Sequence, residues 1–323
     1  MKKLILISSA VAMLFSACQK NSLINTDTPS AITQRSCGSM EVLAEQMKAD
    51  PTLESSMSAY EAVVQNNIKA IENGTSNYRL VNGVIEIPVV VNVLYRTAAE
   101  NISQAQIQSQ IDVLNEDFNA TNADYTKVPS TFSGVKANVG IRFVLDQVIR
   151  KSTTKTSWKT DDAMKKSTKG GINPTTPTTK LNLWVCTLSG GILGYAQFPG
   201  GASATDGVVI LNTGFGRTGT AAAPYNKGRT ATHEVGHWLN LRHIWGDATC
   251  GSDLVNDTPL HNTANYGCPA AGHKSTCSGT PIEMTMNYMD YTDDACMYMF
   301  SAGQKSRVLA TFATGGPRNS FAR

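Results

Sequence analysis

The stretch that decides the fold covers residues 232–243 and reads T-H-E-V-G-H-W-L-N-L-R-H. On a helix, His233 and His237 leave the same face about one turn apart, so both imidazoles can bind one metal ion. Neutral imidazole suits Zn2+. Glu234 is rotated by about 100° from His233, and from there it can act on zinc-bound water as a general base. The H-E-x-x-H pattern is typical of zinc metalloproteases.

A third histidine extends this pattern. His243 stands six residues after His237, which is the spacing of the extended metzincin motif. For His243 to reach the same metal, the helix must end sharply near residue 240, where a left-handed backbone is needed. Asn240 occupies the position that usually holds glycine, and asparagine tolerates this conformation well. The chain has five histidines, and three fall at these spacings, which favours His233, His237 and His243 as zinc ligands over surface groups.

A second segment supports the same site. Residues 287–291 read N-Y-M-D-Y, and Met289 fits a methionine turn that would form an apolar floor under the imidazoles without binding zinc. Tyr291 is predicted to bring its hydroxyl to the oxyanion of a tetrahedral intermediate. Taken alone, Met289 would be one of eleven methionines that fill core space. The three-histidine motif favours the methionine turn.

The composition limits the class of protein. The chain has 323 residues, of which 41% are hydrophobic and 16% are charged, so it can bury a large core and is not wholly disordered. This length fits one large catalytic domain with an appended segment, or two ordinary domains. The net charge of +3 is too small to argue for nucleic-acid binding by itself. The only strongly apolar run, residues 4–15, is about half as long as a membrane-spanning helix.

Residues 1–18 are predicted to be a bacterial export signal. Lys2 and Lys3 precede the apolar run, and small residues lead to Cys18. This order resembles a lipoprotein signal, in which a lipid on Cys18 would anchor the chain to the outer membrane. The alternative is an ordinary signal with a chance cysteine and a secreted product. Export makes disulfides admissible in either case.

The cysteines agree with export. Four of the seven lie in the C-terminal quarter, namely Cys250, Cys268, Cys277 and Cys296. Four cysteines allow three pairings, and the sequence alone does not choose between them. None of their spacings fits a zinc ribbon, so two disulfides in a loop-rich lobe are the better interpretation. Cys186 lies in an apolar strand, where a buried inert thiol is expected.

The remaining pattern predicts an α/β fold, because a strand, a helix, several strands and a second helix follow one another. Helical periodicity covers residues 40–73 and ends at Gly74, whereas residues 151–180 are predicted to be a long solvated loop. Pro88 marks a bulge or an edge position in the first strand. Ser103 and Gln106 form a capping box ahead of a helix. Strands are expected at 84–95, 140–149, 181–186, 194–198 and 206–211, and the helix behind the capping box reaches residue 118.

Four segments together resemble the pappalysin family of metzincin proteases in its smaller bacterial branch. They are HEVGHWLNLRHIWGD, NYMDYTDDAC, LNLWVC with GYAQFPGG, and ISQAQIQSQIDVLNEDFNATNAD, and the similarity spans residues 84–311. The resemblance implies a two-lobed domain with a twisted mixed sheet and the active-site helix above and a small irregular lobe below. It also implies hydrolysis of peptide or protein substrates, which would add along an edge strand.

The resemblance implies further site residues in the lower lobe. It pairs Cys250 with Cys277 and Cys268 with Cys296. Calcium is expected in the loop after the third histidine, where hard oxygen ligands come from Asp253, Asn256, Asp257 and Thr258. The alternative for these residues is ordinary Asx-turn chemistry.

The N-terminal part then reads as a tether and pro-region at residues 19–79, before a catalytic domain at residues 80–323. Cys37 stands in R-S-C-G and resembles a cysteine switch, in which a thiolate takes the fourth zinc position of the zymogen. A free or misassigned cysteine is an equal alternative. Arg79 stands at the boundary where activation by cleavage is expected.

Small bacterial relatives cut before basic residues, and Asp293 and Asp294 follow the methionine turn where the pocket for that residue should lie. A carboxylate there would favour arginine through a bidentate contact, and lysine less. The alternative is that both aspartates bind calcium or face the solvent. The leading interpretation is thus an exported zinc endopeptidase made as a zymogen. The runner-up, a catalytically idle surface lipoprotein that binds proteins or glycans, is disfavoured by the presence of Glu234.

Overall fold

The computed structural model describes residues 32, 34–80 and 82–322. The predicted export signal and Cys18 lie outside the described residues. In the part of the chain that the structure describes, no helix has the length and apolar character needed to cross a membrane.

A five-stranded mixed sheet organises the N-terminal two thirds of the fold, with strand order β3-β1-β4-β6-β5. The first four strands in this order are parallel, and β5 pairs antiparallel with β6 at one edge. The strands are β1 (Ile85–Tyr95), β3 (Ile141–Ser152), β4 (Leu181–Cys186), β5 (Gly194–Ala196) and β6 (Val208–Leu211). The predicted α/β class with a mixed sheet is therefore confirmed.

The first strand lies inside this sheet, because β1 pairs with β3 on one side and with β4 on the other. Its nearly continuous apolar run fits a parallel strand that is buried on both faces. The edge alternative for Pro88 is therefore wrong. The bulge alternative is nearly correct, since the register against β3 shifts between Val89 and Val90, just after Pro88.

The predicted helix at residues 40–73 is in fact two helices, α1 (Ser39–Ala49) and α2 (Leu53–Glu72). Pro51 separates them, because proline offers no N–H for a continuous helix. Helix α3 (Gln104–Phe118) begins at Ser103, whose hydroxyl accepts a hydrogen bond from the Gln106 N–H. Only this half of the predicted capping box forms, since the Gln106 side chain donates to the carbonyls of Asn212 and Phe215.

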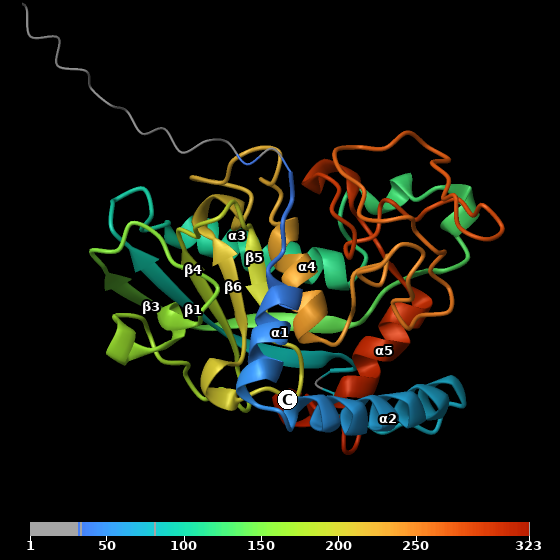
Figure 1. The fold of residues 1–323 in the computed structure, drawn as a ribbon, viewed down its shortest axis with the longest axis horizontal. Coiled ribbons are helices and arrows are strands. Elements are labelled where there is room, and N and C mark those ends of the chain that lie inside the picture. The colour runs from blue at the N-terminus through green and yellow to red at the C-terminus, as the bar shows by residue number, and fades with distance from the viewer. Residues whose placement is uncertain (1–31, 33, 81, 323) are drawn as a thin grey trace, which may run out of the picture. The chain divides into compact units, whose positions relative to one another are not determined.

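The helix that carries the histidine motif is α4 (Arg229–Trp238), and every residue in it is buried. It packs against β5 and β6 on one side and α3 on another, while α1 lies against β5 (Figure 1). The helix ends at Trp238, and Asn240 has φ +72°. The sharp left-handed turn that the histidine spacing requires is therefore present.

The C-terminal part contains mostly loops, drawn in orange and red in Figure 1. Its regular elements are β7 (Phe300–Ser301), paired with β2 (Lys136–Ala137), and helix α5 (Ala302–Phe312), which packs against α2. Disulfides join Cys250 to Cys277 and Cys268 to Cys296, the same pairs that the resemblance implies. Short 3-10 helices cover Tyr125–Lys127, Ser130–Phe132, Ala163–Lys165, Ser167–Lys169, Ser203–Thr205, Asn212–Gly214, Asp294–Cys296 and Asn319–Phe321.

The segment at residues 151–180 is only partly the solvated loop that its composition predicts. Trp158, Met164 and Lys165 are buried in it. The Lys165 ammonium binds the Asp162 carboxylate at 2.9 Å and the Thr205 carbonyl at 2.7 Å. These contacts compensate the burial of its charge, so the segment covers the sheet near the buried Cys186 and Trp184.

Candidate active site

Three histidines converge at the end of α4. The Nε2 atom of His237 lies 3.1 Å from Nε2 of His233 and 3.1 Å from Nε2 of His243. Each Nδ1 has its own acceptor. Nδ1 of His233 lies 2.7 Å from the Tyr288 carbonyl, and Nδ1 of His237 lies 2.8 Å from the Leu241 carbonyl. Nδ1 of His243 lies 2.5 Å from the Asp247 carboxylate. These acceptors keep the proton on Nδ1, so that three Nε2 lone pairs face one another.

This donor set fits a zinc ion. Three lone pairs that face one another cannot form hydrogen bonds, and a cation between them removes their repulsion. Burial lowers the pKa values of His233 and His237 and keeps both rings in the neutral, ligating form. The Cys37 thiol completes the group, since the four ligand atoms lie within 4.8 Å of one another. Within the described ranges no other group of this kind occurs, and three nitrogens with one sulfur suit Zn2+.

The methionine of the second motif lies against this helix. A Cβ added to Gly236 would come within 2.5 Å of the Met289 sulfur, so a glycine at this point of α4 leaves room for the thioether. The Met289 carbonyl accepts a hydrogen bond from the N–H of Ile244, the residue after the third histidine. The methionine segment thus contacts both α4 and the residue that follows the third histidine.

Glu234 lies beside the cluster and is buried. Its Oε2 atom accepts hydrogen bonds from the Ser39 hydroxyl at 3.0 Å and from the Cys37 thiol at 3.3 Å. Burial raises the pKa of this carboxyl to about 8. The sequence indicated Glu234 but not Ser39, which lies 195 residues away in the chain.

Tyr291 contacts the backbone of Cys37. Its hydroxyl accepts a hydrogen bond from the Cys37 N–H at 3.2 Å and donates to the Cys37 carbonyl at 3.4 Å. The ring packs edge-on against His243 and Trp245. Burial raises the pKa of Tyr291 above its usual range, so the hydroxyl keeps its proton as a donor.

The N-terminal segment that carries Cys37 runs along the edge strand of the sheet. The Ser36 carbonyl accepts from the Leu193 N–H at 2.9 Å, and the Gly38 N–H donates to the Gly194 carbonyl at 2.9 Å. The Ser39 hydroxyl accepts from the Ala196 N–H at 2.8 Å. This segment therefore lies where the resemblance expects an extended substrate.

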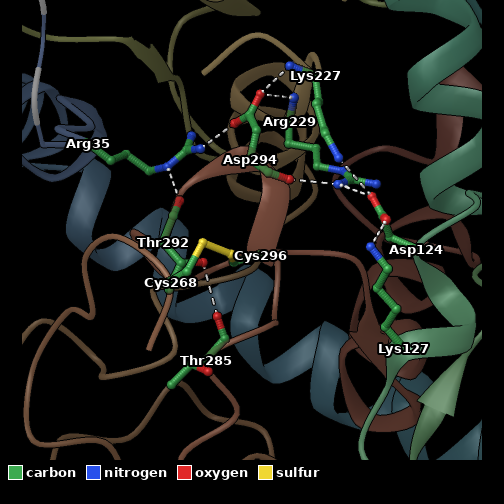
Figure 2. The surroundings of a disulfide bond; sticks show 10 residues. All are labelled: Arg35, Asp124, Lys127, Lys227, Arg229, Cys268, Thr285, Thr292, Asp294 and Cys296. Atoms are coloured by element: carbon green, nitrogen blue, oxygen red, sulfur yellow. Dashed lines mark hydrogen bonds and ion pairs between the residues drawn. A yellow bond between two sulfur atoms is a disulfide. The ribbon is translucent and has the colours of Figure 1, made fainter. Parts of the chain in front are cut away.

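The two aspartates after the methionine turn have different surroundings. Asp294 is buried, and one carboxylate oxygen binds the Arg35 guanidinium at 2.6 Å (Figure 2). Its other oxygen accepts the backbone N–H groups of Lys227 and Arg229, so a single oxygen of this carboxylate contacts Arg35. Asp293 is only half-buried, and among the described residues no hydrogen bond joins it to Arg35.

The loop after the third histidine divides its oxygen atoms between two places. The Asp253 carboxylate accepts from the Thr258 hydroxyl at 2.9 and 3.0 Å. The Asp257 carboxylate accepts instead from the Ser301 hydroxyl at 2.6 Å and from the Gly303 N–H at 2.8 Å. Asn256 lines a cavity between this loop and α2. Asp253 and Thr258 thus contact each other within the loop, whereas Asp257 contacts residues at the start of α5.

Comparisons with known proteins agree with this geometry. Residues 179–313 match the Peptidase_M43 family model, described as pregnancy-associated plasma protein-A. An extracellular metalloprotease of Pyricularia oryzae is 35% identical over 294 residues, which cover 87% of this chain and 89% of the relative. Extracellular metalloprotease 1 of Coccidioides posadasii is 34% identical over 238 residues, covering 69% and 75%.

Two solved structures are also similar. Mature mirolysin of Tannerella forsythia in complex with a cleaved peptide is 46% identical, with a TM-score of 0.71. The alignment covers 73% of this chain and 95% of the mirolysin chain. A promirolysin mutant of Tannerella forsythia is 41% identical, with a TM-score of 0.78. The alignment covers 88% of this chain and 96% of the promirolysin chain.

Proposed function

The chain belongs to the pappalysin-like family M43 of metzincin metalloproteases, and from this premise we propose that it hydrolyses peptide bonds with Glu234 as the general base. It is a secreted zinc protease with a zymogen form. In the proposed domain organisation, residues 19–79 are the tether and pro-region and residues 80–323 the catalytic domain. The precursor of mirolysin covers a larger share of this chain than the mature enzyme, which supports the division.

One contact carries the proposal for the base. The Cys37 sulfur lies with the three histidine nitrogens in one group of ligand atoms, and it is 3.3 Å from the Glu234 carboxylate. A water molecule that replaced this sulfur would lie within hydrogen-bond reach of Glu234. From that position the carboxylate can take a proton from the water and return it to the leaving amine.

The other site residues have supporting roles in this proposal. His233, His237 and His243 hold zinc, which when bound supplies a Lewis acid for the water and the substrate carbonyl. Met289 forms the apolar floor, and Asn240 turns the chain so that His243 reaches the site. The Tyr291 hydroxyl now contacts the backbone of Cys37, and in the reaction it donates to the oxyanion of the tetrahedral intermediate.

Latency is proposed to depend on Cys37. Its thiol occupies the position where water must bind, and Ser39 binds the carboxylate that must activate this water. Release of residues 19–79 frees both groups. Arg79 is exposed at the end of this segment, which supports cleavage at this boundary.

For the cleavage site, we expect a basic residue after the scissile bond. The supporting observation is that buried Asp294 already holds a guanidinium in this structure. Asp293 is less buried than Asp294, and its charge adds to the same field.

We also propose that the lower lobe binds calcium. The Asp253–Thr258 pair supplies hard oxygen atoms, and Asn256 and Asp257 lie in the same loop. An increase in melting temperature on adding calcium to chelator-treated enzyme would support it. The lipid anchor on Cys18 is proposed from the sequence motif alone, and mass spectrometry of the mature N-terminus tests it.

The decisive experiment compares casein hydrolysis by the mature wild type, Glu234→Ala and the surface control Asp112→Ala. Loss of a general base costs about 10²–10⁴-fold in rate, so Glu234→Ala should lose nearly all turnover while zinc content and melting temperature stay close to wild type. A chelator should abolish activity, and zinc should restore it. Retention of more than a tenth of the wild-type rate by Glu234→Ala would refute the mechanism.

A further inference from the structure

Arg307 of α5 is a buried arginine of the catalytic part whose charged partner lies in the pro-region. It is 1% exposed, and arginine is rarely buried this far unless its charge is paired. Its Nη atoms donate to the Glu61 carboxylate of α2 at 2.8 and 2.7 Å, and Nε donates to the Asn240 carbonyl at 2.8 Å. Among the described residues these are its only acceptors, so release of the pro-region leaves the Asn240 carbonyl alone.

An apolar side chain of the catalytic part is covered by the same helices. Phe198 follows β5 and is 4% exposed. Its ring packs against the zinc-motif residue His237, with the ring centroids 5.2 Å apart. Its apolar partners are Leu43 of α1 and Leu53 of α2. The pro-region thus covers an apolar group that lies directly beside the metal-binding motif.

The face of α2 that covers these groups has a simple pattern. Leu53, Met57 and Glu61 are four residues apart in turn, which places them on one face of the helix. Leu53 and Met57 pack in the cluster around Phe198, and Glu61 binds Arg307. Figure 1 shows α2 lying beside α5, the helix that carries this arginine. The catalytic part therefore accepts an amphipathic helix with apolar residues and a carboxylate at helical spacing.

The two pro-region helices do not fill this surface. A cavity of about 490 Å³ remains between them and the catalytic part. On the catalytic side it is lined by Pro199, Asn240, Arg242 and Pro317. Arg242 adds a second positive charge near Arg307, so the surface has both the room and the charge for a partner larger and more acidic than α2.

The surface lies on one defined side of the cleft. The extended stretch at residues 35–39 begins at Asp294 and ends at Ala196 of β5, with Cys37 between them. Phe198 follows Ala196 by two residues. If Asp294 receives the residue after the scissile bond, the residues before this bond lead towards Phe198.

We propose that Phe198, Asn240, Arg242 and Arg307 form a docking surface of the mature enzyme, which binds an amphipathic, carboxylate-bearing helix of a substrate protein before the scissile bond. The inference rests on the proposed function, because the pro-region must leave and the substrate must be a polypeptide. A helix docked there raises the effective concentration of the scissile bond at the zinc site. Substrate choice then depends on a remote segment as well as on the residue after the cut.

The test compares cleavage of two fusion substrates by the mature enzyme. Residues 50–68 of this chain form most of α2 and contain no basic residue. They are joined through a flexible glycine–serine linker to a short cleavage sequence with arginine after the scissile bond, and the second substrate carries Glu61→Gln. The enzymes are wild type, Arg307→Ala, Arg307→Lys and the control Lys305→Ala on the same helix. The readout is the ratio of kcat/KM for the two substrates, which cancels any effect of a variant on the zinc site.

Wild type should cleave the glutamate substrate about 10-fold more efficiently than the glutamine substrate, as expected for a hydrogen bond between charged groups. The difference should lie in KM, because docking does not change the chemical step. Arg307→Ala should bring the ratio close to 1, whereas Lys305→Ala should keep it. Arg307→Lys should fall between them, since lysine keeps the charge but not the two-pronged contact.

A binding measurement tests the surface without turnover. Fluorescence anisotropy follows the helix peptide of residues 50–68, with and without Glu61→Gln, on the mature Glu234→Ala enzyme. The glutamate peptide should bind about 10-fold more tightly, and Arg307→Ala should remove this difference. Failure of wild type to hydrolyse either fusion substrate would refute the proposed function, while the anisotropy still decides whether the helix binds at Arg307.

Two results would overturn the docking surface. One is a wild-type ratio within twofold of 1, and the other is a ratio that Arg307→Ala leaves unchanged. A glutamate peptide that binds through Arg307 but gives no gain in cleavage would mean that the surface only retains the pro-region. That outcome would overturn its role in substrate recognition.

Discussion

Replacing Arg318 with alanine should strongly destabilise the protein, although this residue lies near the end of the chain. Its guanidinium is buried and binds both carboxylate oxygens of Asp206, at 2.7 and 3.0 Å. Nε donates to the carbonyl of Trp238 at 3.0 Å, and the group lies 4.1 Å from the Trp238 ring centroid. Trp238 is the last residue of α4, so Arg318 caps the helix that carries the zinc motif.

The magnitude follows from the charge that the substitution leaves behind. Asp206 is itself 5% exposed, and breaking a buried ion pair by removing one partner costs about 3–5 kcal/mol. A chain of 323 residues has an unfolding entropy of about 0.7 kcal/mol/K, so each kcal/mol lowers the melting temperature by about 1.5 °C and a decrease of about 4–8 °C is expected. Arg318→Lys should lose less, because it keeps the charge but not the two-pronged contact.

The assay is thermal unfolding of the precursor in the inactive Glu234→Ala background, with Arg79→Ala as the exposed control. Asp206→Ala combined with Arg318→Ala should cost less than the sum of the single changes, because no unpaired charge remains. A loss below about 1 kcal/mol for Arg318→Ala, the range of an exposed ion pair, would refute the assignment.

The remaining predictions concern the turn, the pro-region and its response to acid. Asn240→Ala should lower the free energy of unfolding by about 1–2 kcal/mol, because residue 240 has a left-handed backbone. Asn240→Gly should leave it nearly unchanged. Competition with a chelator should show weaker zinc binding for the alanine variant only. Cys37→Ala should make the full-length precursor active before any cleavage, and a peptide assay on uncleaved protein would contradict the switch if that variant stayed latent. The pair with Arg307 lowers the pKa of Glu61 to about 2, below its unfolded value of about 4.3. The stabilisation from this pair is complete above the unfolded pKa and is lost as the pH falls from about 4 towards 2. Limited proteolysis of the pro-region should therefore accelerate over this interval, and Glu61→Gln should show no such step.

The sequence was sufficient where the physics is local. Helical spacing alone brings His233 and His237 to one face, and the need for a left-handed residue explains why Asn240 ends the helix. The strand at residues 181–186 was predicted with the bounds that the structure has, because an apolar run bounded by turns is a local pattern. The zinc motif and the α/β class needed no knowledge of distant contacts.

Some features were ambiguous because one pattern is compatible with two environments. Proline fits both a bulge and an edge strand, and only the pairing of β1 on both sides decided for the interior. Polar composition predicted a solvated loop at residues 151–180, yet Lys165 is buried there because Asp162 and Thr205 provide acceptors. Whether a charged side chain can be buried depends on the acceptors that the fold brings to it, and the composition of a segment does not show which acceptors these are.

Tertiary structure alone decided the contacts between distant segments. Arg35 and Asp294 are 259 residues apart, and no periodicity relates them. The contact arises because the N-terminal segment adds to the sheet edge and the methionine turn folds back under α4. Arg318 reaches the end of α4 for the same kind of reason, across 80 residues. Local sequence patterns reflect backbone geometry over a few residues, which fixed the zinc motif, whereas a buried charge finds its partner only after the whole chain has packed.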